Sequence, residues 1–388
     1  MPFFRNRTIN LLNLHYVIHA MAVSGGGAFY AVYLLKAGVP VPGVLIALAL
    51  ILLGRLMIRP LIVPYAIRFG LRSTIVAGTM VSALQYPLVA EVHGPGRALA
   101  LLIAVSAAGE TFYWTAYHAY FAALGDDALR GHQIGVREAM ATLATIASPL
   151  VAAWLLVAFG PRAAFGATGI IRFCAALPLL WAPDVNVSPQ ALGIYKASAL
   201  SFLLFVADGW MAACCVTVWQ IALFLSLRES VVGYGGAMAF AGLASAVAAL
   251  TLGRHIDTGH GRRAIWYATG TVAVIIALRA AATGHPPLAV LANALGAFGA
   301  SLYIPTVMTP VYTMAKGSPC ALRFHTATEG GWDIGGAAAL STGALATWFG
   351  APLPAVILLA LTGVAATATL LRRYYARRAP RVAAAASA

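Results

Sequence analysis

The sequence predicts an all-α membrane protein in which twelve transmembrane helices form two six-helix, pseudo-symmetric halves. The first observation is composition, because 61% of the 388 residues are hydrophobic and only 9% are charged, whereas soluble domains carry about 25% charged residues. The second is that apolar stretches long enough to cross a ~30 Å hydrocarbon core recur along the whole chain. The third is a basic turn that occurs once in each half, as expected of two parallel copies of one unit.

Each apolar stretch is assigned one helix. The expected ranges are 11–35, 41–67, 73–90, 97–122, 134–158, 162–182, 197–225, 231–253, 264–282, 287–314, 325–348 and 351–371. Polar Asn13, His15 and His19 interrupt the first of them and eleven more spans follow, so we expect an uncleaved first helix rather than a signal peptide.

The longest polar connection divides the chain into its two halves. This segment contains Pro183, Ser188 and Pro189, which discourage a continuous helix. We therefore expect an N-terminal bundle at 1–182, a cytoplasmic linker at 183–196, a C-terminal bundle at 197–373 and a basic cytoplasmic tail at 374–388.

The basic residues indicate how the chain lies in the membrane. The net charge of +14 would suggest nucleic acid as a partner of a soluble chain. Here most Lys and Arg residues fall in loops on one side of the predicted helices, which the positive-inside rule assigns to the cytoplasm. We expect a monomeric, multi-pass protein of a bacterial inner membrane, bound to lipid and not to nucleic acid, with both termini cytoplasmic. The basic residues expected outside are Lys36, Arg97, Arg162, Arg228 and Arg279.

The repeated turn carries a family resemblance. Its second copy has Asp257, Gly261, Arg262 and Arg263, while the first has Arg68, Gly70 and Arg72 but Ile67 in place of the acid. With twelve spans in two halves, this turn resembles the signature of the major facilitator superfamily. The resemblance implies that family's fold, transport by alternating access, and a central cavity lined by helices 1, 4, 7 and 10. A loose match to a helix-5 pattern around Pro149 slightly favours export.

The fourth predicted helix holds the most informative polar cluster. Glu110, Tyr113, Trp114, Tyr117 and His118 follow the spacing i, i+3, i+4, i+7, i+8, which predicts that all five share one helical face. A carboxylate and an imidazole beside aromatic rings can bind a ligand, and a buried carboxylate can exchange a proton. The alternative is an aromatic packing seam with a Glu–His pair.

Polar residues on three other helices are further candidates, because intramembrane polar groups are costly and tend to be functional. Asp208 in helix 7 is the second candidate for carrying a coupling proton. His15 and His19 are one turn apart and could bind a metal, but no third ligand is evident, so we expect no metal and no cofactor. The remaining expected substrate-binding residues are Tyr30, Cys215, Trp219, Asn293 and Tyr303.

Intramembrane arginines and charged helix ends suggest two more roles. Arg55 and Arg172 are candidate counter-charges for an anion. Charged residues at the cytoplasmic helix ends are expected to form a gate of ion pairs between the halves, with Glu329 and Asp333 near Arg68 and Arg72. The expected gate residues are Arg68, Arg72, Arg130, Arg137, Glu138, Asp257, Arg262, Arg263, Arg323, Glu329 and Asp333.

These observations predict a secondary transporter of a small organic solute, coupled to protons, with export favoured over uptake. The chain contains none of the HExxH, GxSxG or P-loop patterns, so we expect no enzyme activity. One alternative is a facilitator or exchanger of organic anions that uses the intramembrane arginines. A more remote alternative is a membrane sensor that binds its ligand without transporting it.

Overall fold

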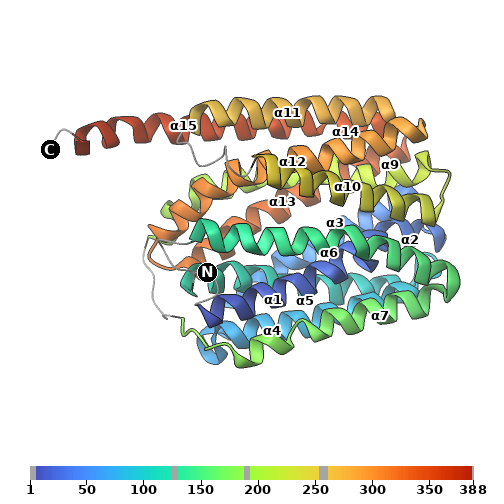
Figure 1. Ribbon diagram of the computed structural model, residues 1–388, viewed down its shortest axis with the longest axis horizontal. Coiled ribbons are helices and arrows are strands. Elements are labelled where there is room, and N and C mark those ends of the chain that lie inside the picture. Colours follow the sequence, from blue (N-terminus) through green and yellow to red (C-terminus); the bar gives the residue numbers. More distant parts are fainter. Residues whose placement is uncertain (1–5, 125–129, 188–192, 253–260, 387–388) are drawn as a thin grey trace.

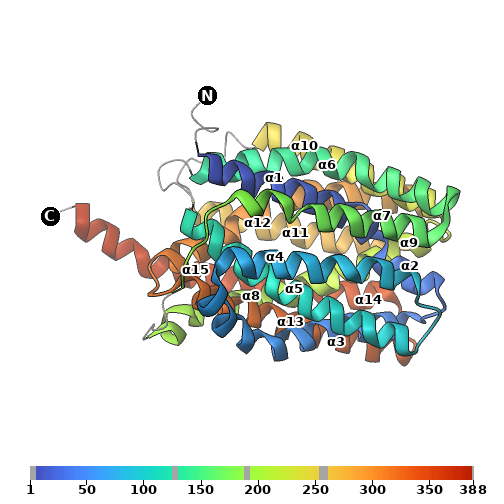
Figure 2. The same cartoon turned by 90° about the horizontal axis from the view of Figure 1, so that it is seen from below.

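The computed structural model describes residues 6–124, 130–187, 193–252 and 261–386, and every regular element in these ranges is a helix. Apolar composition drives this result, because a backbone in lipid must satisfy its hydrogen bonds within the segment. Figures 1 and 2 show long helices lying roughly side by side, with α15 extending beyond one end of the bundle.

In the described residues of the first half there are ten helical elements. They are α1 (Arg7–Ser24), η2 (Gly26–Phe29), α2 (Tyr30–Lys36), α3 (Val41–Ile58), η3 (Arg59–Leu61), α4 (Ile62–Ala90), α5 (Arg97–Leu124), α6 (Arg130–Ala158), α7 (Gly160–Cys174) and η4 (Leu177–Trp181). The second half comprises nine. They are α8 (Ile194–Ala212), the π-helical η5 (Ala213–Thr217), α9 (Val218–Ser226), α10 (Val231–Leu252), α11 (Gly261–Ala282), α12 (Pro286–Lys316), α13 (Ala321–Trp348), α14 (Leu353–Leu358) and α15 (Ala360–Ala386).

The described residues contain 10 helical segments long and apolar enough to cross a membrane. One of them, Val41–Ala90, covers the second and third predicted spans, and its helical course is broken at Gly70, where φ is +82°. The polar helix α13, which carries Glu329 and Asp333, is not among the 10. The predicted class, an all-α multi-pass membrane protein, is confirmed, and the helices are consistent with twelve spans.

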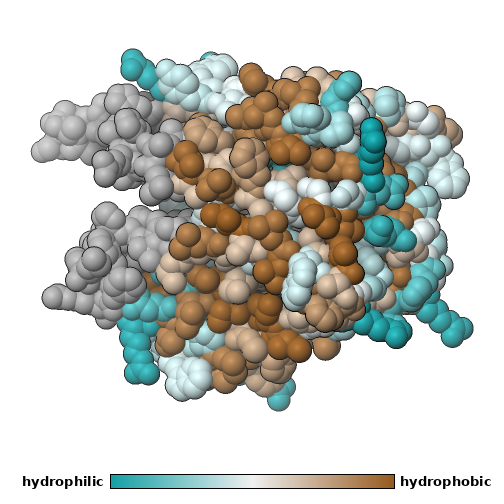
Figure 3. Space-filling view, turned by 45° about the vertical axis from the view of Figure 1, so that its right-hand side comes forward, coloured by the Kyte–Doolittle hydropathy of each residue, from teal (hydrophilic) through white to brown (hydrophobic). Residues whose placement is uncertain are grey.

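Large apolar side chains cover much of the outer surface. Met57, Ile170, Val274 and Trp348 are among the exposed hydrophobic residues. Figure 3 shows hydrophobic residues across the middle of one face and hydrophilic residues gathered toward its right-hand end. In water such a surface would aggregate, so it is the surface of a protein solvated by lipid.

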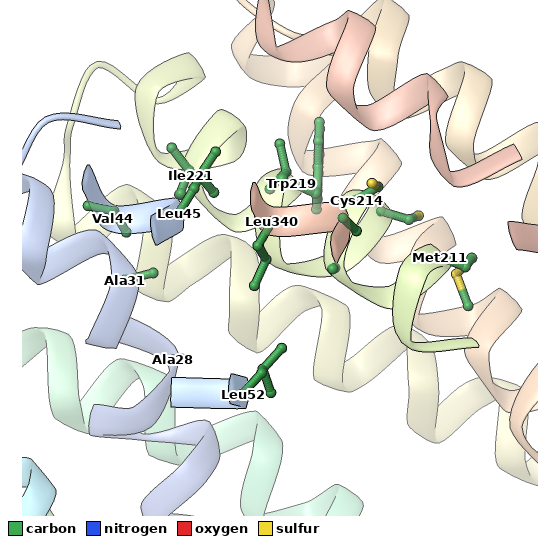
Figure 4. Packing of buried hydrophobic residues seen from close by; sticks show 14 of the residues in the cluster. Ala28, Ala31, Val44, Leu45, Leu52, Met211, Cys214, Trp219, Ile221 and Leu340 are labelled. Atoms are coloured by element: carbon green, nitrogen blue, oxygen red, sulfur yellow. The ribbon is translucent and has the colours of Figure 1, made fainter. Parts of the chain in front are cut away.

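At one level of the bundle the halves meet through apolar contacts. The Tyr234 ring meets the Phe29 ring edge-on at 5.3 Å, and its hydroxyl donates to the Ala28 carbonyl at 3.1 Å. A single buried cluster includes Leu45 from α3 and Leu340 from α13, and Figure 4 shows labelled members from both halves. This end of the interface is therefore sealed by dispersion and burial rather than by charge.

Helix α13 packs unusually closely on α8. A Cβ atom built on Gly335 would lie 2.0 Å from the Val206 carbonyl oxygen, and one on Gly331 would lie 2.3 Å from that of Phe202. Glycine at these positions lets the two backbones touch. The contact fixes the position of α13, which carries two of the charges described below.

Candidate functional site

Aromatic and histidine side chains of α1 and α5 form one buried cluster. The His15 Nε2 atom lies 3.2 Å from the Tyr113 hydroxyl, and its Nδ1 lies 2.6 Å from the Ala175 carbonyl oxygen. His19 stacks on Tyr113 with ring centroids 4.5 Å apart, and Tyr113 stacks on Tyr117 at 5.7 Å. The structure thus brings together candidates from two predicted helices.

The five candidates on α5 do not share a single environment. Tyr113 and Tyr117 are fully buried against α1, whereas Glu110, Trp114 and His118 retain some exposed surface. The last three follow the spacing i, i+4, i+8 and form a stripe beside the two tyrosines, whose rings the Trp114 ring meets edge-on. The five side chains thus occupy one face of α5, an arc of about 140° that is wide enough to contact two neighbours.

Neutral donors hold Glu110. Its carboxylate accepts hydrogen bonds from Trp114 Nε1 at 2.7 Å and from Gln85 Nε2 at 3.1 Å. Trp114 also stacks on His118, with ring centroids 5.8 Å apart. Within the described ranges, Glu110 makes no ion pair, and its two hydrogen-bond donors are neutral.

A buried network of charges joins the two halves near this stripe. From α13, Asp333 accepts from Arg59 and lies 2.9 Å from Arg55 Nε, while Glu329 lies 3.5 Å from Arg55 Nη2. All four side chains are buried. His118 Nε2 lies 3.7 Å from Glu329, which connects the network to the α5 stripe.

The network is at a different level from the apolar seal. Arg55 lies ten residues after Leu45 on α3, which corresponds to about 15 Å along a helix. The two halves therefore meet through hydrophobic side chains at one level and through paired charges at the other. Separating the second contact exposes charges that water can solvate, whereas separating the first exposes apolar surface.

These pairs correct the expected gate. Glu329 and Asp333 were expected near Arg68 and Arg72, but their arginine partners are Arg55 and Arg59. The reason is depth, because both acids lie in the third and fourth turns of α13 and face the membrane-embedded part of α3. Arg55, a candidate counter-charge for an anion or for an acidic partner, is paired with Glu329 and Asp333.

The first copy of the basic turn contacts the linker instead. Arg72 donates from its backbone nitrogen to Asp184 at 3.0 Å and from Nη1 to the Ala182 carbonyl at 3.0 Å. Gly70 is needed there, because a Cβ atom on it would lie 2.3 Å from the Asp184 carboxylate. Asp184 thus supplies an acid to the copy that has Ile67 at the acidic position. Arg68 lies over the Phe69 ring at 5.2 Å.

Most of the other gate candidates have side chains that lie outside the described part of the chain. Asp257 lies outside the described residues, and the side chains of Arg130, Arg137, Glu138 and Arg262 also fall outside them. Arg263 is exposed at the start of α11, and Arg323 lies in the first turn of α13. Their gating role stays a prediction.

The second half presents Asp208 in a setting like that of Glu110. The Tyr303 hydroxyl donates to Asp208 at 2.9 Å. About 15 Å farther along these helices, Trp219 Nε1 of α9 donates to Asn293 of α12 at 3.1 Å, and Asn293 donates to the Ala237 carbonyl at 3.0 Å. The predicted candidates of helices 7 and 10 are therefore in direct contact, pair by pair.

Two further candidates have structural partners. The Cys215 carbonyl, within the π-helical turn, accepts from Arg279 at 2.5 Å, and Arg279 lies over the Trp219 ring at 5.3 Å. Arg279, which was expected on the outer side of the membrane, is buried and lies in the last turn of α11. Tyr30 shares a hydrogen bond of 3.1 Å with Ser106.

Arg172 is fully buried. Its guanidinium lies 4.2 Å from the centre of the Tyr113 ring, and its Nε donates to Ser82 at 2.8 Å. Its Nη1 and Nη2 atoms are buried and have no hydrogen-bond partner among the described residues. Cation–π attraction accounts for part of its stabilisation.

Comparisons with known proteins identify the family. The model of the Major Facilitator Superfamily matches residues 12–241, which is more than half of the chain. The chain belongs to the major facilitator superfamily. It is therefore a membrane transporter of a small molecule and not an enzyme. The comparison with curated protein sequences gave no match.

Solved structures of the superfamily share this fold. The Escherichia coli fucose:proton symporter FucP is 15% identical over 95% of this chain and 99% of that chain, with a TM-score of 0.65. An auto-inhibited POT family peptide transporter is 14% identical over 96% and 97%, with a TM-score of 0.63. The human organic anion transporter MFSD10 is 16% identical over 94% and 99%, with a TM-score of 0.59. At these identities the similarity shows the fold alone.

Three buried or partly buried residues that contact the candidates were not predicted as part of the site. Arg59, Gln85 and Tyr312 all contact predicted candidates, Tyr312 through a 3.1 Å hydrogen bond to His118. A signal for Arg59 existed in the sequence. Arg55 and Arg59 are four residues apart, and so are Glu329 and Asp333. Each of the two helices therefore carries a pair of charges one turn apart, positive on one helix and negative on the other.

Proposed function

We propose that this transporter couples the movement of a small organic solute to the movement of protons, with Glu110 and Asp208 as the proton-carrying groups. The observation that carries the proposal is how differently the intramembrane acids are held. Glu110 and Asp208 accept hydrogen bonds from neutral donors, whereas Glu329 and Asp333 are tied to arginines. A carboxyl group can be protonated at much lower cost when no ion pair must be broken.

The solute binds, in this proposal, between the two carboxyl groups. Trp114 and His118 on α5 and Tyr303 on α12 provide stacking and hydrogen bonding, and each already contacts an acid or another ring of the site. The fully buried His15, His19, Tyr113 and Tyr117 brace α5 from behind. Trp219 and Asn293 brace the corresponding helices of the second half.

The buried network is proposed to be the gate at the cytoplasmic end. While Arg55 and Arg59 hold Asp333 and Glu329, α3 and α13 stay together and this end is closed. His118 lies 3.7 Å from Glu329 and stacks on Trp114, the donor to Glu110. A proton or solute at Glu110 can therefore alter the stability of the closed state through direct contacts, as a conformational shift requires.

Export is the proposed direction. The helix-5 segment that favoured it includes Pro149, and a Cβ atom on Gly235 of α10 would lie 2.9 Å from the Pro149 carbonyl oxygen and 2.7 Å from Ala153 Cβ. The segment thus lies at a close contact between the two halves. Such a contact is where a bend in a helix can influence the motion of one half against the other.

The test compares two modes of transport in proteoliposomes. Compounds that raise the unfolding temperature of the purified protein identify the solute, because ligands that bind the folded state stabilise it. With that solute, Glu110→Gln and Asp208→Asn should abolish transport driven by a pH gradient, while exchange of labelled for unlabelled solute continues. Gradient-driven transport at the wild-type rate in both variants would contradict the assignment.

A second candidate, a facilitator or exchanger of organic anions, is supported by Arg172. This guanidinium has no acidic partner among the described residues, and its two terminal nitrogens lack hydrogen-bond partners there. Arg172→Gln should then abolish binding of carboxylates, with the exposed Arg162→Gln as the control. Binding of carboxylates at wild-type affinity by Arg172→Gln would exclude this candidate.

A further inference from the structure

A hollow outside the proposed transport site lies between α11 and α15. Its volume is about 530 Å³, and its lining residues are Trp266, Thr369, Arg372, Arg373 and Ala376. Figure 1 shows α11 and α15 running side by side toward the end at which α15 leaves the bundle. None of the residues that line the hollow takes part in the contacts between the two halves described above.

The chemistry of the hollow fits an anion. Arg372 and Arg373 are both exposed, and the Arg372 guanidinium lies 5.1 Å from the centre of the Trp266 ring, which limits its orientations. No Asp or Glu follows Asp333 in the sequence, so α15 brings no acid to neutralise them. Two adjacent guanidinium groups with one of them held by stacking are suited to a phosphate, which accepts several hydrogen bonds at once.

The hollow lies where a lipid headgroup would be. Trp266 is near the start of the segment Arg263–Ala282, and both arginines are near the end of the segment Leu353–Ala376, two segments apolar enough to span the bilayer. Tryptophan and arginine at the ends of spanning helices lie at headgroup level. Farther along α11, Val274 is 68% exposed and offers an apolar surface for acyl chains.

We propose that this hollow binds the phosphate of an anionic phospholipid on the side of the membrane that the basic loops assign to the cytoplasm. Arg372 and Arg373 contact the phosphate, Trp266 fixes Arg372 and covers the glycerol region, and the acyl chains lie along α11 and α15. The proposal does not depend on which solute is transported or on proton coupling. It differs from general attraction of the basic tail, because it requires two particular arginines.

The test uses purified full-length protein in nanodiscs that contain phosphatidylcholine and a labelled phosphatidylglycerol. Each arginine near an anionic surface contributes about 1 kcal/mol, or about fivefold in affinity. Arg372→Gln/Arg373→Gln should therefore weaken binding of the labelled lipid about 30-fold. The matched control, Arg377→Gln/Arg378→Gln, removes the same charge beyond the last lining residue and should weaken it much less.

Two outcomes would overturn the proposal. Equal losses in the two double variants would show that the tail attracts anionic lipid without a specific site. Displacement of the lipid by millimolar inorganic phosphate would show a site for free phosphate instead. Trp266→Leu provides a further check, because it keeps both charges yet should weaken lipid binding by removing the group that holds Arg372. Wild-type lipid affinity in Trp266→Leu would contradict the proposed geometry.

Discussion

Replacing Asp333 with asparagine tests the buried network most sharply. Asp333 is fully buried and contacts Arg55, at 2.9 Å, and Arg59. In Asp333→Asn the two guanidinium groups are left with Glu329, which lies 3.5 Å from Arg55. The cluster then changes from two positive and two negative charges to a net positive charge in a medium that solvates it poorly.

The expected loss of stability is large. Removing one partner of a buried ion pair costs about 3–5 kcal/mol, because the remaining charge stays buried without compensation. The matched control is Asp184→Asn, which removes the acid beside Arg72 at a position where the two side chains are 29% and 35% exposed. Such a partly solvated pair contributes about 0–1 kcal/mol. Unfolding in detergent, followed by tryptophan fluorescence against denaturant concentration, measures both.

A charge-balanced variant separates electrostatics from packing. Arg59→Met/Asp333→Leu removes one positive and one negative charge together and leaves Arg55 with Glu329. Buried pairs replaced by apolar groups of similar size often leave stability unchanged, so this double variant should recover most of the loss seen in Asp333→Asn. The reasoning is refuted if Asp333→Asn unfolds at the wild-type denaturant concentration, or if the double variant unfolds as early as the single one.

Two further predictions concern packing and pH. Gly335→Ala should lower the free energy of unfolding by about 1–3 kcal/mol through overpacking, because its Cβ would lie 2.0 Å from the Val206 carbonyl oxygen. The control, Gly236→Ala, should leave the free energy of unfolding unchanged, because no atom lies within 4 Å of its Cβ. Equal denaturation midpoints for the two variants would contradict the close contact of α8 and α13. Arg162 donates to Glu91 at 2.9 Å and 3.1 Å and holds the pKa of that carboxyl below its usual range. A carboxyl group whose pKa is lowered in the folded protein stabilises that protein at pH values above the pKa. The difference in stability between wild type and Glu91→Gln should therefore be present at pH 7 and vanish as the pH falls below about 4. A difference that grows in acid would show that the Arg162–Glu91 pair does not stabilise the protein through the ionised carboxylate.

The sequence was sufficient to predict the helical class and the helices that carry the polar candidates. Composition and hydrophobic length determine these properties locally, so each span could be recognised without knowing its neighbours. The contact of Trp114 with Glu110 follows from their spacing on one helix, whereas the contact of Tyr303 with Asp208 joins two helices whose pairing was not predicted. Their functional roles stay predictions.

Partners across the halves could not be predicted in the same way. Glu329 and Asp333 were recognised as charged neighbours on one face, but their pairing with Arg55 and Arg59 depends on which helix of the first half lies opposite α13. The position of α13 is determined by close backbone packing, for example of Gly335 against Val206. The spacing of residues in the sequence does not reveal such packing. The contact that Arg279 makes could not be predicted for a related reason, since its acceptor is a backbone carbonyl in a π-helical turn.

Proton movement across a vesicle membrane tests the central claim most directly. Purified protein is reconstituted with a pH-sensitive dye trapped inside, and the solute identified by thermal stabilisation is added outside without any imposed gradient. The account predicts a change in internal pH that starts with solute addition, requires the wild-type protein, and is absent in Glu110→Gln and Asp208→Asn. Solute entry measured in parallel with no change in internal pH would contradict proton coupling and leave a facilitator of the same fold.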